Sequence, residues 1–117
     1  LFDAAGTATI AALQNTVFPG YDGEKIDFKN KTNKKLPLIK TPIPITVSKI
    51  GNELIIDPVI EEEKSRDARL TATVIEDGRL CALQKGEDGS LSLEEINKMV
   101  ELAIEKSKEL KKYLRWN

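Results

Sequence analysis

Apolar and polar positions alternate through the middle of the chain as they do in half-buried strands. Ile43, Ile45 and Val47 are each followed by Pro, Thr or Ser, which makes one face of the segment apolar. Similar runs predict strands over residues 43–48, 53–57, 69–75 and 79–85. Gly51-Asn52 and Asp77-Gly78 are two-residue hairpin signals, the second typical of a type I′ turn. We therefore expect a four-stranded, mainly antiparallel sheet.

Helices are predicted before and after these strands. Asp3 is a suitable N-cap for an alanine-rich helix over residues 4–13, which carries no charge and has to be covered on most sides. Ser92 and Glu95 form a capping box that opens a long C-terminal helix. The apolar face of that helix is predicted to comprise Ile96, Met99, Val100, Ala103, Ile104, Ser107, Leu110 and Leu114. This order indicates an α+β fold with helices on one face of the sheet. Because Leu54, Ile55 and Ile56 are continuously apolar, the other face is expected to be covered as well, by something absent from this chain.

Residues 19–42 are predicted to form a loop, because prolines and glycines interrupt them throughout. Six lysines lie between Lys25 and Lys40 inclusive, and Asp27 is the only acid after Lys25 in that range. One interpretation is a loop that contacts a polyanion such as RNA, through Lys31, Lys34 and Lys35. The other is a solvated connector, since only Phe28 is available within the lysine-rich part to stack on bases.

Composition narrows the class of protein. A chain of 117 residues fits one domain, residues 1–117, and a net charge of −1 offers no general attraction for nucleic acid. The absence of histidine removes the commonest general base and metal ligand. The single cysteine, Cys81, is expected to be a small buried hydrophobe. No apolar run is long enough to span a bilayer and no signal peptide is present, so we expect a cytoplasmic protein without membrane contact. The apolar start at Leu1, without Met, is interpreted as a cut within a longer protein.

One group of residues could carry chemistry. Asp57 ends a predicted strand and is followed by three glutamates, Glu61 to Glu63, and then by Arg66 and Asp67. Carboxylates at such a place could hold a divalent cation or supply a general acid. A charged, exposed turn is the alternative. No Gly-rich phosphate loop, CxxC or HExxH motif is present, and we predict neither a metal site nor a cofactor.

A succession of short blocks along the chain carries a family resemblance. The blocks are residues 1–5, 11–16, 35–37, 50–52, 56–58 with 61–63, 67–71 and 80–86. In this order and at these spacings they resemble the second half of the RNase PH-like exosome ring subunits, and in particular their archaeal, non-catalytic branch. The resemblance covers nearly the whole chain, and the lysine-rich part matches least well.

The resemblance implies an RNase PH domain 2-like fold and a first half that this chain lacks. It implies a hexameric ring with a catalytic RNase PH-like paralogue, cap subunits with RNA-binding domains, and RNA that is degraded from its 3′ end by phosphate. The active paralogue has two aspartates six positions apart. Asp57 and Glu63 stand at the matching positions here. We therefore expect a vestigial carboxylate pair in a non-catalytic subunit, which structures the active site of its paralogue and assists RNA binding.

Two other functions remain open from the sequence. The chain could itself be a catalytic phosphorolytic exoribonuclease subunit, because a carboxylate is kept at position 63. It could also be an unrelated α/β interaction module whose lysines bind an acidic partner.

Overall fold

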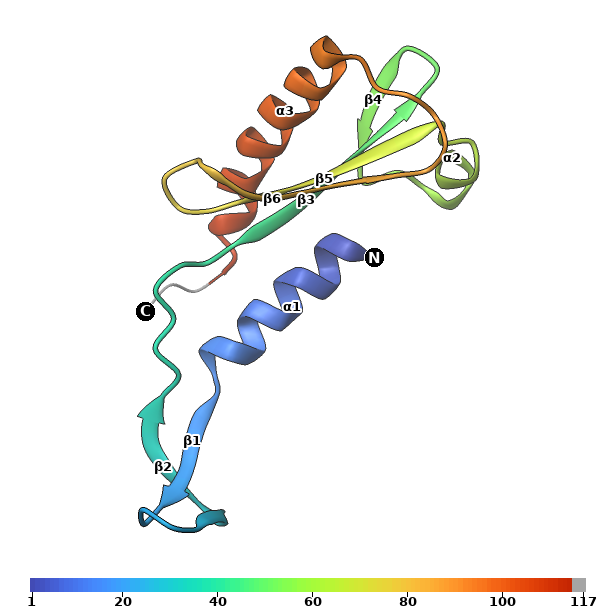
Figure 1. The fold of residues 1–117 in the computed structure, drawn as a ribbon. Coiled ribbons are helices and arrows are strands. Elements are labelled where there is room, and N and C mark those ends of the chain that lie inside the picture. The colour runs from blue at the N-terminus through green and yellow to red at the C-terminus, as the bar shows by residue number, and fades with distance from the viewer. Residues whose placement is uncertain (115–117) are drawn as a thin grey trace.

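The computed structural model describes residues 1–114 and divides into a compact body and a protruding arm (Figure 1). The elements are α1 (Phe2–Gln14), β1 (Val17–Tyr21), β2 (Ile26–Lys35), β3 (Ile43–Ile50), β4 (Glu53–Ile56), α2 (Ile60–Lys64), β5 (Ala68–Val74), β6 (Leu80–Gly86) and α3 (Leu93–Lys111). The body contains α1, α2, α3 and a four-stranded sheet in the order β4-β3-β5-β6. The arm is the β1–β2 hairpin, residues 17–35. With extents of 58 × 28 × 23 Å, the molecule is clearly elongated.

The predicted sheet is confirmed, and all its neighbouring strands are antiparallel. Ile45 pairs with Ala72 and Val47 with Leu70, so apolar side chains from β3 and β5 lie together on one face. Met99 and Ala103 of α3 are fully buried against this face. The α+β class therefore follows from the alternation seen in the sequence, because every second residue of β3 faces the core.

The long C-terminal helix begins as predicted. The Ser92 hydroxyl accepts a hydrogen bond from the backbone N–H of Glu95 at 3.1 Å, and the Glu95 carboxylate accepts one from the N–H of Ser92 at 2.8 Å. This reciprocal pair satisfies backbone donors that the first helical turn leaves free. The Glu95 carboxylate also pairs with Lys49 of β3 at 2.6 Å, which ties the start of α3 to the sheet.

The prediction that both helices cover one face of the sheet is wrong. α1 lies on the face of β3 opposite α3 (Figure 1). A Cβ on Gly6 would lie 2.3 Å from the Pro44 ring, so glycine is what allows the helix to approach β3 this closely. Strand periodicity explains the arrangement, because Pro44 and Thr46 point away from the α3 side that Ile43, Ile45 and Val47 occupy.

The predicted N-cap role of Asp3 is also wrong. α1 begins at Phe2, and its N-cap residue, Leu1, makes no side-chain capping hydrogen bond. The Asp3 carboxylate instead accepts hydrogen bonds from the backbone N–H of Thr46 at 2.8 Å and from the Thr46 hydroxyl at 2.6 Å. The edge strand β4 ends opposite Val47 and does not reach Thr46. Asp3 therefore supplies the acceptor for the backbone N–H of Thr46.

Of the two predicted hairpin turns, one has the expected form. Gly51, with φ 58°, lies in a two-residue turn that pairs Ile50 with Glu53. The turn at Asp77-Gly78 is not type I′, which requires positive φ at both residues. Only Gly78 has positive φ, 83°, and its N–H donates to the Ile75 carbonyl. Next to this turn, the pairing of β5 with β6 has a register shift between Thr73 and Val74.

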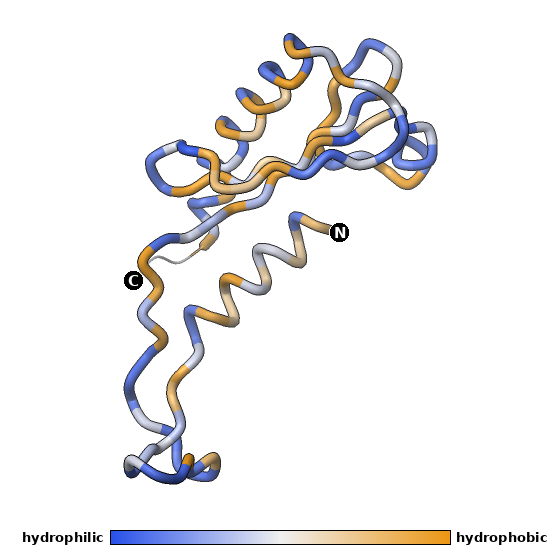
Figure 2. The backbone as a smooth tube through the Cα atoms, in the orientation of Figure 1, coloured by the Kyte–Doolittle hydropathy of each residue, from blue (hydrophilic) through white to orange (hydrophobic). Residues whose placement is uncertain are grey.

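The prediction of a loop over residues 19–42 is wrong for its first part. Residues 17–35 form an antiparallel hairpin with two register shifts, which pairs Val17 with Lys35 and Tyr21 with Ile26. Neither strand contains a buried residue, so burial left no hydrophobic alternation to recognise. Figure 2 shows mostly hydrophilic colouring at the tip of the arm, which lies at the far end of the molecule from the four-stranded sheet and α3.

β6 is a sheet edge, and its exposure overturns the expectation for Cys81. The Cys81 side chain is exposed, and its thiol lies 3.5 Å from the Thr73 carbonyl. Six of the seven β6 residues are exposed, because neither α1 nor α3 covers this strand substantially. β4 forms the opposite edge, and its Leu54, Ile55 and Ile56 are only half-buried.

Among residues 1–114, no helix has the length and apolarity needed to cross a bilayer.

Candidate functional site

A hollow of about 430 Å³ lies where the start of α1 meets the end of β4 and the α2 segment. Its lining brings Asp57 and Glu63, the carboxylate pair of the sequence analysis, to one place. The complete lining is Leu1, Phe2, Asp3, Ala4, Thr46, Asp57, Pro58, Glu63, Arg66 and Arg69. Residues from five segments therefore meet here, and any chemistry at the carboxylates is set by neighbours distant in sequence.

The backbone at Asp57 has an unusual conformation. Its φ is 57°, in the left-handed region that residues with a Cβ seldom adopt, and Pro58 follows directly. The short exposed helix α2 then carries the three glutamates, of which Glu62 accepts a hydrogen bond from the Val59 N–H at 2.8 Å. Glu62 is thus used to start the helix, while Glu63 reaches the hollow. Such local strain is typical of positions that the surrounding structure holds in place.

Two arginines line the hollow beside these carboxylates: Arg66, which the sequence analysis included in the group, and Arg69, which it missed. Arg66 donates to the Glu87 carboxylate at 2.7 Å, and Arg69 Nε lies 3.4 Å from the same oxygen. Arg66 Nη1 is also 4.0 Å from Glu63 Oε1. The hydrogen bond from Arg66 lowers the pKa of Glu87 below its usual value. Glu87 has a positive φ of 66°, like Asp57. The two non-glycine residues with positive φ in the described chain are therefore Asp57, which lines the hollow, and Glu87, which pairs with its arginines.

This arrangement behaves as an ion-paired network. Asp3, Asp57 and Glu63 line the hollow with Arg66 and Arg69, and Glu87 pairs with both arginines, so the network offers no net positive charge to a phosphate. Asp3 is already engaged by Thr46. Within residues 1–114, no three acids, cysteines or histidines lie close enough together to hold a metal ion.

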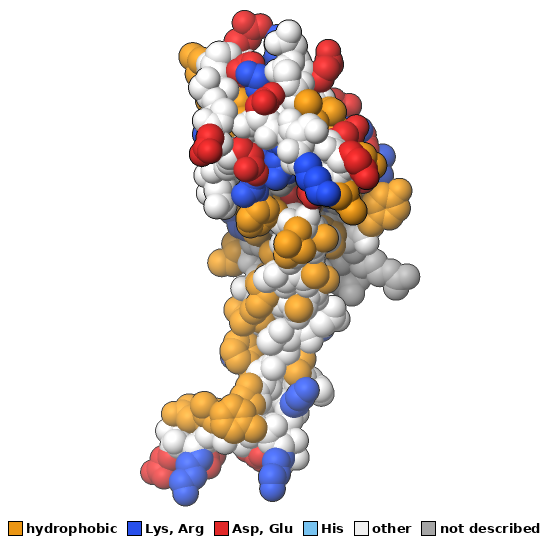
Figure 3. All heavy atoms as spheres, turned by 90° about the vertical axis from the view of Figure 1, so that its right-hand side faces the viewer, with side chains coloured by type: hydrophobic (Ala, Val, Ile, Leu, Met, Phe, Trp, Pro, Cys, Tyr) orange, Lys and Arg blue, Asp and Glu red, His pale blue; other side chains and the backbone are white. Residues whose placement is uncertain are grey.

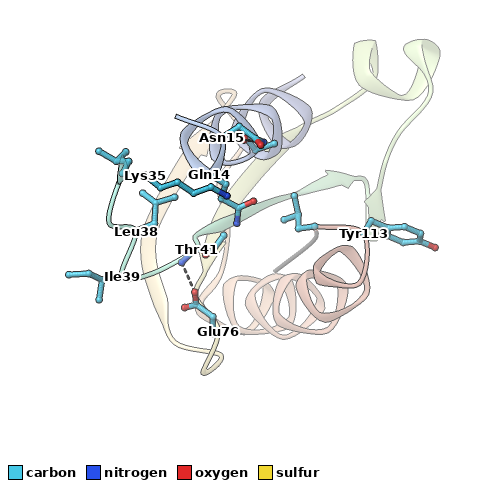
Figure 4. Close-up of a pocket in the computed structure, with 11 residues that line it drawn as sticks. Gln14, Asn15, Lys35, Leu38, Ile39, Thr41, Glu76 and Tyr113 are labelled. Carbon is cyan, nitrogen blue, oxygen red and sulfur yellow. Dashed lines mark hydrogen bonds between the residues drawn. The ribbon is translucent and has the colours of Figure 1, made fainter. Parts of the chain in front are cut away.

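The structure does not bring the three candidate lysines to a single site. Lys34 lines an open groove on the arm together with Phe18 and Tyr21. Lys35 lines a different hollow, of about 630 Å³, at the base of the arm, where Gln14, Asn15 and Tyr113 also lie (Figure 4). Lys31 pairs with Pro19 along the hairpin and lines neither space.

The groove on the arm was not foreseen from the sequence. Its volume is about 660 Å³, and its lining is Phe18, Pro19, Tyr21, Ile26, Thr32 and Lys34. In the space-filling view, apolar side chains gather on the arm above charged ones at its tip (Figure 3). The sequence does contain a signal for this groove, because Phe18 and Tyr21 lie three positions apart just before the lysines. That signal could be used only once β1 was known to pair with β2 in a hairpin.

Comparison with known proteins accounts for this fold. The family model described as "3' exoribonuclease family, domain 2", the RNase PH C-terminal domain, matches residues 40–106. The chain is 41% identical to the exosome complex component Rrp42 of Thermococcus gammatolerans over 97% of its own length and 43% of that protein. It is 42% identical to Rrp42 of Pyrococcus horikoshii, with 96% and 42% covered. It therefore spans less than half the length of these curated relatives.

Solved structures agree with the sequence relatives. A chain described as "archaeoglobus fulgidus exosome with RNA bound to the active site" superposes with a TM-score of 0.80 at 28% identity, over 97% of this chain and 42% of that one. A chain of an "Archaeal exosome core" gives a TM-score of 0.80 at 29% identity, over 97% and 44%. The family match over residues 40–106, together with the fold, shows that the chain belongs to the 3′ exoribonuclease family, as a domain of the RNase PH C-terminal type.

Proposed function

We propose that this chain is the C-terminal domain of a non-catalytic ring subunit in an archaeal, cytoplasmic exosome that degrades RNA from the 3′ end. In this proposal residues 1–117 form the single domain of a second half, and a related first half belongs to the same subunit. The subunit alternates with a catalytic RNase PH-like paralogue in a hexameric ring, beneath cap subunits that carry RNA-binding domains. It supports the paralogue's active site and assists RNA binding through Lys31, Lys34 and Lys35.

The observation that supports the non-catalytic assignment is the presence of Arg66 beside the Asp57–Glu63 pair. Arg66 lies 4.0 Å from Glu63 and is anchored by Glu87 at 2.7 Å. A fixed guanidinium at this point competes with any divalent cation for the Glu63 carboxylate, since both are attracted to the same oxygens. Phosphorolysis also needs an anion site, and the acids of the hollow outnumber its arginines.

The experiment is an assay for nucleoside diphosphates after incubation with single-stranded RNA, inorganic phosphate and Mg²⁺. The chain alone should release none above a buffer control, and adding the catalytic paralogue should produce release. Asp57→Asn should leave the activity of the mixture unchanged.

The other candidate is a catalytic subunit, and one observation favours it: Asp57 and Glu63 line the same hollow. It predicts that the full-length subunit releases diphosphates without its paralogue, and that Asp57→Asn abolishes this release. That result would overturn the non-catalytic assignment, whereas loss of activity only in the mixture would show that Asp57 supports the paralogue.

A further inference from the structure

The arm presents exposed aromatic surface together with positive charge. The exposed fractions are 38% for Phe18, 67% for Tyr21 and 52% for Ile26, and these three residues line the open groove. The Tyr21 hydroxyl donates to the Gly23 carbonyl at 2.7 Å, and the Thr32 hydroxyl donates to the Phe18 carbonyl at 2.7 Å. In the folded hairpin these bonds tie the Tyr21 side chain to the turn and β2 to the backbone at Phe18, so both aromatic residues lie beside the groove.

The lysine beside these rings has no acidic partner. Lys34 Nζ lies 5.7 Å from the centre of the Phe18 ring, within the range of a cation–π contact. Among the described residues, Lys31, Lys34 and Lys35 form no ion pair.

Two of the three acids of the arm, Asp22 and Asp27, are in contrast hydrogen-bonded at its tip. The Asp22 carboxylate accepts hydrogen bonds from the N–H groups of Glu24 and Lys25. The Asp27 carboxylate accepts them from the N–H groups of Lys29 and Asn30. The groove itself is lined by no acid, so an anion meets no repulsion inside it.

These features favour a nucleic acid over a protein partner. Protein–protein interfaces are depleted in lysine and enriched in arginine, whereas residues 17–35 carry five lysines and no arginine. Proteins that bind single-stranded nucleic acid combine basic side chains, which follow the phosphates, with aromatic rings on which successive bases stack. Both components lie on this hairpin, and a groove of about 660 Å³ is large enough for small planar ligands.

We propose that the groove on the arm is a binding site for single-stranded RNA, in which Phe18 and Tyr21 stack on bases and Lys34 contacts the adjoining phosphate. This deepens the proposed function, because it assigns the RNA contact to a defined surface and makes stacking its main contribution. Lys31 and Lys35, which lie outside the groove, then contribute only electrostatic attraction.

The test is RNA affinity, measured by fluorescence anisotropy with a labelled single-stranded oligonucleotide at several salt concentrations. Phe18→Ala with Tyr21→Ala should weaken binding by at least about tenfold without changing the slope of log affinity against log salt. Lys34→Ser should weaken binding and reduce that slope by about 0.7, the value for one phosphate contact on a single strand. Phe28→Ala is the matched control: this ring is on the same arm and 78% exposed, but it lies outside the groove, so affinity should not change.

A second variant separates stacking from simple disruption of the arm. Phe18→Leu keeps apolar volume but removes the aromatic face, and it should also weaken binding. Wild-type affinity in the Phe18→Ala/Tyr21→Ala variant, or no RNA binding by the wild-type chain at low salt, would overturn the proposal. If the Phe18→Ala/Tyr21→Ala variant keeps its RNA affinity but associates more weakly with the catalytic paralogue in sedimentation, the proposal is also overturned. The groove would then be a protein interface. The assay contains no phosphate or Mg²⁺, so its outcome is independent of whether the chain is catalytic.

Discussion

The body and the arm are both built from antiparallel strands, yet they bury very different amounts of side chain. In the body, Ile45 and Val47 of β3 are 2% and 0% exposed between α3 and the rest of the sheet. In the arm, no residue of β1 or β2 is buried. A two-stranded hairpin of this kind gains little stability from packing. The difference indicates that the body carries the stability of the domain, whereas the arm presents its side chains to a partner.

The strongest test of this contrast uses the same substitution in both regions. Ile45→Ala removes a side chain that is 2% exposed and should destabilise the chain by about 2–5 kcal/mol. Ile26→Ala removes the same atoms from an arm strand where the residue is 52% exposed, and should change stability by less than about 0.5 kcal/mol. Urea unfolding followed by circular dichroism measures both. Similar losses at the two positions would show that the arm is part of the core.

A second test concerns α1, the helix of the body that leads directly into the arm. Gly6→Ala would improve the stability of an exposed helix by about 1 kcal/mol through helix propensity. Here the added Cβ would lie 2.3 Å from the rigid Pro44 ring, so we expect a net destabilisation of about 1–3 kcal/mol. Thermal unfolding gives the sign directly. A rise in melting temperature would mean that α1 is not held closely against β3.

The smallest effect is expected from the ion-paired network of the body. Arg66 lowers the pKa of Glu87 from its usual value of 4.5, so the stability from this pair is present above that value and is lost as the pH falls below it. Glu87→Gln should lower the melting temperature slightly at pH 7, and this difference should shrink as the pH falls below 4.5. A constant difference across this pH range would assign the effect to packing instead of charge.

The same contrast explains how much of the molecule the sequence predicts. β3 and β5 were recognisable because burial of one face imposes alternation, as at Ile43, Ile45 and Val47. The capping box at Ser92 was recognisable because both partners lie within one helical turn. The strands of the arm were missed because they bury no residue and contain Pro19 and Gly20, which are read as turn signals.

The candidate sites follow a similar rule. Asp57 and Glu63 are close in sequence, so a resemblance to a known family was enough to pair them. Glu87 lies 21 residues from Arg66, and no local pattern connects the two before the sheet brings them together. Asp3 likewise reaches a backbone group 43 residues away, so a residue suited to cap its own helix instead holds that helix to the sheet.

Hydrogen exchange of backbone amides, with and without single-stranded RNA, tests the division into body and arm most directly. In the free chain we expect the amides of β3 and β5 to exchange slowly and those of residues 17–35 to exchange quickly, since the hairpin opens at little cost. Addition of RNA should slow exchange in residues 17–35 and leave β3 and β5 unchanged. Slow exchange of the arm in the free chain, or no protection of the arm by RNA, would contradict the account.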